Sequence, residues 1–224
     1  MADLDGPRLE PASGAAKQLV VFLHGYGADG NDLIDIGRAW QSLLPDAAFV
    51  SPHAPRPCGQ APSGREWFPL TFRDPNERWT GVNAAAPDLN TFLDAELQRR
   101  NLPPSALALV GFSQGTMMSL HVGLRRATAP AAIVGYSGML VMPEVDAEID
   151  AFTQEIRARP PVLLIHGDAD ELIPVQAVFH AAQGLSALEV PVEFHISPGV
   201  GHGIDQEGLR HGGEFLAKRF GSRR

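Results

Sequence analysis

Apolar positions occur along this chain in two kinds of block. Short, continuously apolar runs with strand character occur at residues 18–23, 47–50, 106–110, 131–136, 162–165 and 190–196. Residues 33–44, 88–99 and 116–124 instead carry apolar side chains at helical spacing. Continuously apolar strands are buried on both faces, and here helices alternate with them. The pattern therefore predicts a three-layer α/β fold with a mostly parallel sheet covered by helices on both faces.

Two segments, 52–86 and 137–160, have no regular period. Both are long for simple connections, and long connections over one sheet edge are typical of lids or binding loops. With 224 residues, no internal repeat and no linker-like segment, the chain is expected to form one domain over residues 1–224.

The charge of the chain argues against a polyanionic partner. The formal net charge is −8, and basic residues are scattered along most of the sequence, so neither a nucleic-acid interface nor stable membrane anchoring is expected. The first seven residues form no leader pattern, and no later run reaches membrane-spanning length. The single cysteine, Cys58, cannot form an internal disulfide. These features predict a cytoplasmic protein.

One pentapeptide carries the strongest chemical signal. Gly111-Phe112-Ser113-Gln114-Gly115 lies between the apolar run 106–110 and the helical segment 116–124. A G-x-S-x-G pattern in this position is typical of a nucleophile elbow, a strained turn that lifts the serine hydroxyl above the sheet edge. A side chain at Gly111 or Gly115 would collide with the adjoining strand and helix. The alternative is an ordinary glycine-rich connection.

A serine nucleophile needs a base beside it, and ligands of a parallel sheet bind at the carboxyl ends of its strands. His202 lies in the glycine-rich loop 198–203 that follows the last predicted strand, and it is the preferred base. His24, His53 and His166 also follow predicted strands and stay open as alternatives. Buried histidines in such positions more often bond backbone groups.

The base in turn needs a carboxylate. In hydrolases with a nucleophile elbow this carboxylate follows the serine and precedes the histidine along the chain. Asp168 and Asp170 both qualify. Asp168 follows Gly167 in a tight turn, where an aspartate often bonds only the local backbone, so Asp170 is preferred. A metal site at Asp168, Asp170 and Glu171 would lack the further oxygen ligands that calcium requires.

Acyl transfer also needs N–H donors for the developing oxyanion. The backbone amide of Gln114 directly follows the serine, and that of Tyr26 lies in the loop after an early strand, as this chemistry requires.

The same early loop permits a different interpretation. Residues 25–30 match the dinucleotide pattern G-x-G-x-x-G between a strand and a helix. A dinucleotide-binding fold also requires an acidic residue at the end of the next strand, where this chain has Val50-Ser51-Pro52. That interpretation leaves Ser113, Asp170 and His202 without a role.

Taken together, the motifs resemble one family. They are Phe22-Leu23-His24-Gly25-Tyr26-Gly27, Pro52-His53-Ala54-Pro55, Trp67-Phe68, Gly111-Phe112-Ser113-Gln114-Gly115, the run 166–174 from His166 to Pro174, and Gly201-His202. In this order they resemble the phospholipase/carboxylesterase family, which includes acyl-protein thioesterases and bacterial carboxylesterases. The resemblance implies an α/β-hydrolase without a separate cap domain that hydrolyses small-molecule esters or thioesters without a cofactor. It also supports Asp170 as the catalytic aspartate and the Tyr26 and Gln114 amides as oxyanion donors.

The substrate pocket is expected to draw on Trp67, Phe68, Leu70 and Met139, for each of which ordinary core packing is the alternative. An acyl-protein thioesterase, a lysophospholipase, a peptidase and a non-catalytic ligand-binding protein on the same fold are the other candidate functions. An apolar patch at the mouth of the site could also hold a second copy of the chain in a homodimer.

Overall fold

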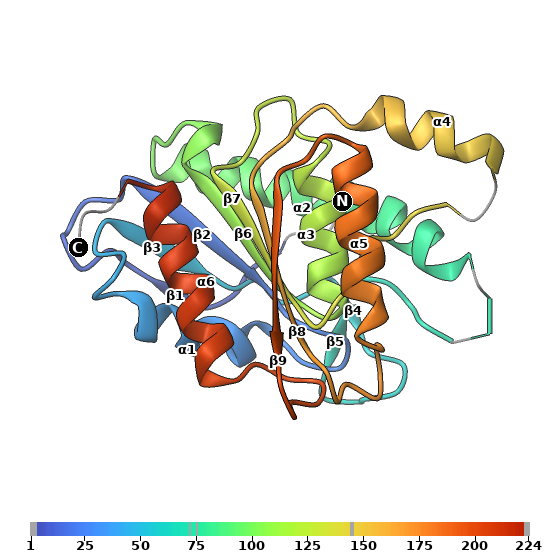
Figure 1. Ribbon diagram of the computed structural model, residues 1–224. Helices are drawn as coiled ribbons and strands as arrows, with labels where there is room; N and C mark the ends of the chain where they lie inside the picture. Colours follow the sequence, from blue (N-terminus) through green and yellow to red (C-terminus); the bar gives the residue numbers. More distant parts are fainter. Residues whose placement is uncertain (1–3, 72, 75, 144–145, 222–224) are drawn as a thin grey trace.

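The centre of the molecule is a seven-stranded sheet (Figure 1). The computed structural model describes residues 4–71, 73–74, 76–143 and 146–221. In spatial order the strands are β1 (Arg8–Leu9), β3 (Ala47–Val50), β2 (Gln18–Leu23), β6 (Leu107–Phe112), β7 (Ala132–Tyr136), β8 (Val162–Gly167) and β9 (Val192–Ser197). β1 pairs antiparallel with β3, and the other neighbouring strands pair in parallel. The mostly parallel sheet is therefore confirmed; the two-residue β1 is too short to give a sequence pattern.

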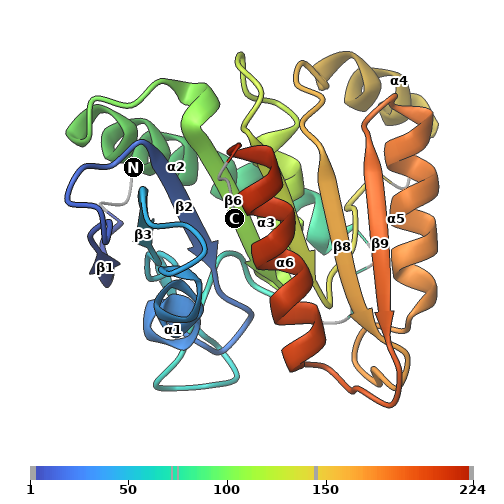
Figure 2. The ribbon, with the colours of Figure 1, turned by 60° about the vertical axis from the view of Figure 1, so that its left-hand side comes forward.

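Helices cover both faces of the sheet (Figures 1 and 2). They are α1 (Gly30–Trp40), α2 (Glu77–Arg99), α3 (Gln114–Gly123), α4 (Asp146–Glu155), α5 (Gln176–Ala187) and α6 (Gln206–Arg219), with a 3₁₀ turn at Pro104–Ala106. Val20 and Phe22 of β2 pack in one core with α1 and α6, and Leu19, Val21 and Leu23 pack in the other core with α2, α3 and α5. Successive strand residues point to opposite faces, which explains this division and confirms the three layers.

The two segments without a sequence period contain regular structure. Residues 52–86 hold a small sheet of β4 (Arg56–Pro57) and β5 (Arg65–Glu66) and also the first half of α2. The predicted start of this helix at Asp88 was wrong, because Pro87 lies inside it. The early turns of α2 pack on Phe68, whose ring atoms would lie 2.3 Å from a Cβ at Gly81. This tertiary contact supports a stretch whose small residues give no helical signal. Within 137–160 the structure contains α4; residues 144 and 145 lie outside the described part.

The prediction that every strand is buried on both faces was wrong for β9. Its pattern of burial is mixed, and Phe194 is 48% exposed and stacks edge-to-face on Phe179 of α5, with ring centroids 5.5 Å apart. β9 pairs with β8 on one side and forms the edge of the sheet, so helices cover it less completely. No helix in the described ranges is long and apolar enough to cross a membrane.

Candidate active site

The strand-to-helix turn at Ser113 is strained. Its φ of 53° and ψ of −115° lie where L-residues are rare. A Cβ at Gly115 would lie 1.8 Å from the carbonyl oxygen of Leu23, and one at Gly111 would lie 2.4 Å from the Gly115 backbone. The expected need for glycine on both sides of the serine is therefore confirmed. Thr116 Oγ1 lies 2.9 Å from the carbonyl oxygens of both Gly111 and Tyr136 and helps to fix the turn.

Asp170 is buried, and both of its carboxylate oxygens are engaged. Oδ1 accepts hydrogen bonds from the backbone N–H groups of Leu172 and Ile173, each at 2.9 Å. Oδ2 lies 2.8 Å from Nδ1 of the half-buried His202. A carboxylate only accepts, so Nδ1 carries the proton and Nε2 of His202 is left as an acceptor. This is the orientation that a general base requires.

Three chain segments converge on the elbow. A Cβ at Gly25 would lie 3.4 Å from Ser113 Cβ, so the loop after β2 lies directly beside the serine. The His202 ring packs on Phe112, the residue before the serine, with ring centroids 5.0 Å apart. The loop that carries His202 also packs closely on the end of β8, because a Cβ at Gly167 would lie 2.1 Å from the carbonyl oxygen of Val200. The carboxyl ends of β2, β6 and β8 thus bring the predicted residues into one region.

The rings of His24 and His53 contact backbone groups. The Nδ1 atom of buried His24 lies 2.8 Å from the Gly25 carbonyl oxygen, and its Nε2 accepts from the Ala54 N–H at 3.0 Å. Burial, the largest cause, lowers the pKa of His24 to about 4, so the ring is neutral. Nδ1 of His53 accepts from the Gly30 N–H at 3.1 Å. Neither ring is oriented by a carboxylate in the way that His202 is.

Asp168 makes the backbone contact that turn chemistry predicts. Its side chain is exposed, and Oδ1 accepts from the N–H of Gly199 at 2.6 Å. Asp168 therefore anchors the 198–203 loop rather than an imidazole. The Asp170 carboxylate is bound by two N–H groups and His202, so the two aspartates have separate protein partners.

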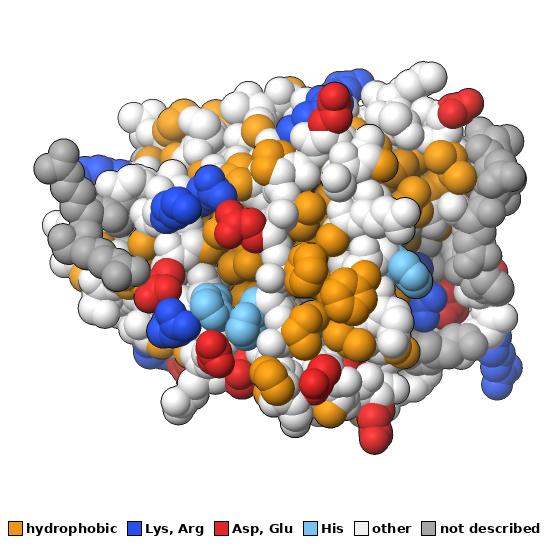
Figure 3. All heavy atoms as spheres, in the orientation of Figure 1, with side chains coloured by type: hydrophobic (Ala, Val, Ile, Leu, Met, Phe, Trp, Pro, Cys, Tyr) orange, Lys and Arg blue, Asp and Glu red, His pale blue; other side chains and the backbone are white. Residues whose placement is uncertain are grey.

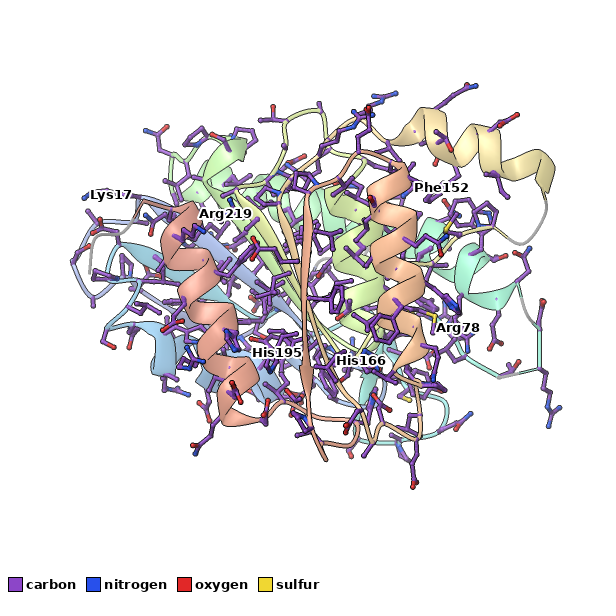
Figure 4. The ribbon with its side chains drawn as sticks, viewed as in Figure 1. Lys17, Arg78, Phe152, His166, His195 and Arg219 are labelled. Atoms are coloured by element: carbon purple, nitrogen blue, oxygen red, sulfur yellow. The ribbon has the colours of Figure 1, made fainter. Side chains whose placement is uncertain are left out.

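His166, the third alternative, is labelled in Figure 4, and its ring contacts the Asp170 carboxylate rather than standing free to act as a base. Its ring is buried, with Nε2 2.8 Å from the carbonyl oxygen of Ile173 and 3.3 Å from Asp170 Oδ2. A proton on Nε2 satisfies the carbonyl and faces the carboxylate. Sequence reasoning missed this positioning role, although the i,i+4 spacing of His166 and Asp170 was visible.

The side chain of Gln114 has a role that sequence reasoning also missed. It is buried, its Oε1 accepts from the Trp67 N–H at 2.9 Å, and its Nε2 donates to the Phe68 carbonyl at 2.8 Å. Trp67 Nε1 also donates to the carbonyl oxygen of His24 at 3.0 Å. The elbow therefore holds the Trp67–Phe68 segment on one side, and the loop after β2 holds it on the other.

The predicted pocket residues are dispersed. Trp67 and Phe68 line a pocket of about 610 Å³ against α2, although each side chain is only 1% exposed. Met139 lines a separate pocket of about 350 Å³ with residues of α2 and α5. Leu70 is buried in the core and lines neither pocket. Ser113 is not in the lining of either pocket; the first pocket is linked to the elbow through the bonds of Gln114 to Trp67 and Phe68.

Tyr26 lies half-buried on the loop beside the serine, and burial, with its neighbours Cys58 and Glu66, raises the pKa of its phenol. Its side chain therefore stays protonated.

The glycines of this loop have local structural reasons: a Cβ at Gly30 would lie 2.1 Å from the carbonyl oxygen of Ser51. These contacts explain the glycine pattern without a dinucleotide.

The sheet order, the strained elbow and the histidine loop define an α/β-hydrolase. Residues 4–220 match the phospholipase/carboxylesterase family, and the chain belongs to that family, as the motifs predicted. It is thus an enzyme of the ester-hydrolysing serine hydrolase class. No separate cap is evident in the described ranges.

Individual relatives agree with this assignment. The crystal structure of esterase PE8 is 44% identical, with a TM-score of 0.91 over 97% of this chain and 99% of that one. Acyl-protein thioesterase 1 of Gibberella zeae is 27% identical over 96% of this chain and 95% of its own length. Esterase YpfH of Escherichia coli is 26% identical over 87% of this chain and 80% of its own length.

Proposed function

We propose that this chain is a serine carboxylesterase that hydrolyses carboxylic esters through Ser113, His202 and Asp170, without a cofactor. The observation that carries the proposal is the 2.8 Å contact between Asp170 Oδ2 and His202 Nδ1, with Oδ1 held by two backbone amides, beside a strained serine elbow. Such a contact fixes the tautomer in which His202 can accept the serine proton.

The reaction is a two-step acyl transfer. His202 Nε2 takes the hydroxyl proton of Ser113 as the serine oxygen attacks the ester carbonyl, and it then protonates the departing alcohol. His202 next takes a proton from water, which attacks the acyl-enzyme, and returns that proton to the Ser113 oxygen as the bond to the acyl group breaks and the acid is released. The buried Asp170 carboxylate stabilises the imidazolium that forms in each step.

The oxyanion is held by the backbone amides of Gln114 and Tyr26. Gln114 is the first residue of α3, where helix N–H groups have no partner within the helix and the positive end of the dipole favours an anion. Tyr26 follows Gly25, whose backbone lies beside Ser113. Because both amides are fixed before the substrate arrives, they stabilise the developing charge without reorganisation.

We assign the acyl group to the predicted residues that line a pocket, which are Trp67 and Phe68 in one pocket and Met139 in another; the buried Leu70 lines neither and packs in the core. The two pockets, of about 610 and 350 Å³, support this assignment, because ligand pockets are lined mostly by apolar side chains with few polar groups. A cytoplasmic location, a homodimer and a single domain over residues 1–224 stay predictions.

The proposal is tested with p-nitrophenyl esters from acetate to long acyl chains, on the native chain and Ser113→Ala. Activity in the native chain and a loss of several orders of magnitude in the variant are expected. Ser119→Ala is the matched control, because Ser119 Oγ bonds the Gly115 carbonyl within α3 and takes no part in the reaction. Equal turnover in native and Ser113→Ala protein would show that the nucleophile is wrong, and no turnover of any ester by either protein would favour a binding role.

Thioester hydrolysis is a second candidate, supported by the similarity to acyl-protein thioesterase 1. The same nucleophile and base attack both acyl groups, so the ratio of kcat/KM for matched ester and thioester substrates measures the preference directly. A lysophospholipid with the same acyl chain tests the lysophospholipase alternative in the same assay.

A further inference from the structure

A cluster of potential metal ligands lies on the β9–α6 face, outside the proposed catalytic set. His195 comes from β9, and Glu207 and His211 come from α6; each offers one ligand atom, and the three atoms lie within 4.8 Å of one another. The two imidazole rings have centroids 4.4 Å apart. In Figure 3 histidine side chains lie together on this face among charged groups, and Figure 4 places His195 between β9 and α6.

The hydrogen bonding of this cluster is incomplete. His195 Nε2 is buried and has no hydrogen-bond partner among the described residues, which is unusual for a buried ring nitrogen. Glu207 and His211 are four residues apart and so share one face of α6, with His211 Nε2 3.5 Å from Glu207 Oε1. A cation between the three groups would give the His195 nitrogen a partner.

We propose that His195, Glu207 and His211 bind a divalent transition-metal ion, with Zn²⁺ as the best match. Two imidazole nitrogens and one carboxylate oxygen are ligands that Zn²⁺ prefers, and a fourth position stays open to water. Tetrahedral ligands at about 2.0–2.1 Å from zinc lie roughly 3.4 Å apart. The three ligand atoms now lie within 4.8 Å of one another, so they must move slightly closer together to bind the ion. The exposed Glu207 side chain is free to make such a movement. The ion would tie the edge strand β9 to α6.

The positive charge of Arg210 beside the cluster allows a test with a predicted direction. Its guanidinium lies 3.3 Å from His211 Nε2 and 3.8 Å from Glu207 Oε1, while its other nitrogen bonds Glu214 at 2.8 Å. A positive charge in this position competes with a bound cation. Replacing Arg210 with Gln should therefore tighten Zn²⁺ binding, whereas an indifferent surface charge would have no effect.

The experiment is titration of the metal-free native chain with Zn²⁺ by calorimetry, with thermal unfolding in parallel. We expect one equivalent to bind at this site and to raise Tm. His195→Gln, His211→Gln and Glu207→Gln should each weaken binding at least as much as the roughly 10- to 100-fold loss typical of an outer-shell metal partner. His180→Gln removes an exposed histidine of α5 and is the matched control, with no change expected.

The variants also separate this proposal from zinc binding elsewhere and from misfolding. Glu207 is exposed, so Glu207→Gln tests the site without disturbing the core. Equal stoichiometry and affinity in the native chain and in a His195→Gln/His211→Gln double variant would overturn the proposal, as would the absence of binding at millimolar Zn²⁺. Ester hydrolysis by the metal-free protein is an independent measurement, because no proposed catalytic residue is a ligand.

Discussion

Replacing Asp170 with Asn tests how the catalytic imidazole is oriented. The two oxygens of Asp170 are not equivalent, because Oδ1 accepts from two backbone N–H groups while Oδ2 contacts His202. An asparagine must therefore keep its carbonyl oxygen on the backbone amides. The reverse orientation would leave the part-buried Leu172 N–H and the buried Ile173 N–H without an acceptor, at a cost of about 1–3 kcal/mol for the buried group.

The favoured orientation places the amide NH₂ against His202 Nδ1. Nδ1 must then accept, the ring proton moves to Nε2, and the nitrogen beside the serine can no longer take its proton. A change of this kind lowers kcat about 10⁴-fold in a serine protease, which corresponds to about 5 kcal/mol of transition-state stabilisation. We expect a loss of this order in Asp170→Asn, with little change in KM.

The assay is p-nitrophenyl butyrate hydrolysis, with thermal unfolding to show that the variant folds. The matched control is Asp168→Asn, in which the exposed side chain keeps an oxygen for the N–H of Gly199; its kcat should stay close to that of the native chain. The reasoning would be refuted if Asp168→Asn lost more activity than Asp170→Asn, or if Asp170→Asn kept a substantial fraction of the native kcat.

Two other predictions concern the surroundings of the site. Gln114→Met keeps the shape of the side chain but leaves the Trp67 N–H and the Phe68 carbonyl without partners. Urea unfolding should therefore show a free energy of unfolding lower by about 1–3 kcal/mol for each group. An unchanged free energy of unfolding would show that these two bonds, the Gln114 clamp, do not hold the segment. Burial holds the pKa of His24 at about 4, below its usual 6.5, so the unfolded chain binds more protons between these values. The contribution of His24 to the free energy of unfolding should be complete above pH 6.5 and should be lost as the pH falls through 4. This loss amounts to about 3 kcal/mol. The glutamine in His24→Gln does not titrate, so the free energy of unfolding in urea should change less between pH 7 and pH 4.5 in this variant than in the native chain. An equal change in both proteins would contradict the prediction.

Much of the fold could be predicted from local pattern. The apolar runs from 18–23 to 162–165 became parallel strands because their alternation with helices leaves few other ways to bury both faces. The first half of α2 could not be predicted. Its small residues carry no period, and its support comes from Phe68, outside the helix.

The G-x-S-x-G pattern between a strand and a helix was enough to predict the elbow, although the need for glycine at position 115 comes from the carbonyl oxygen of Leu23 in β2. The groups that surround the elbow could not be predicted in the same way. The contact of Asp170 with His202, the clamp of Gln114 on the Trp67 backbone and the meeting of His195 with His211 each join different elements. Such contacts depend on strand order and on the path of the loops, which residue spacing does not encode.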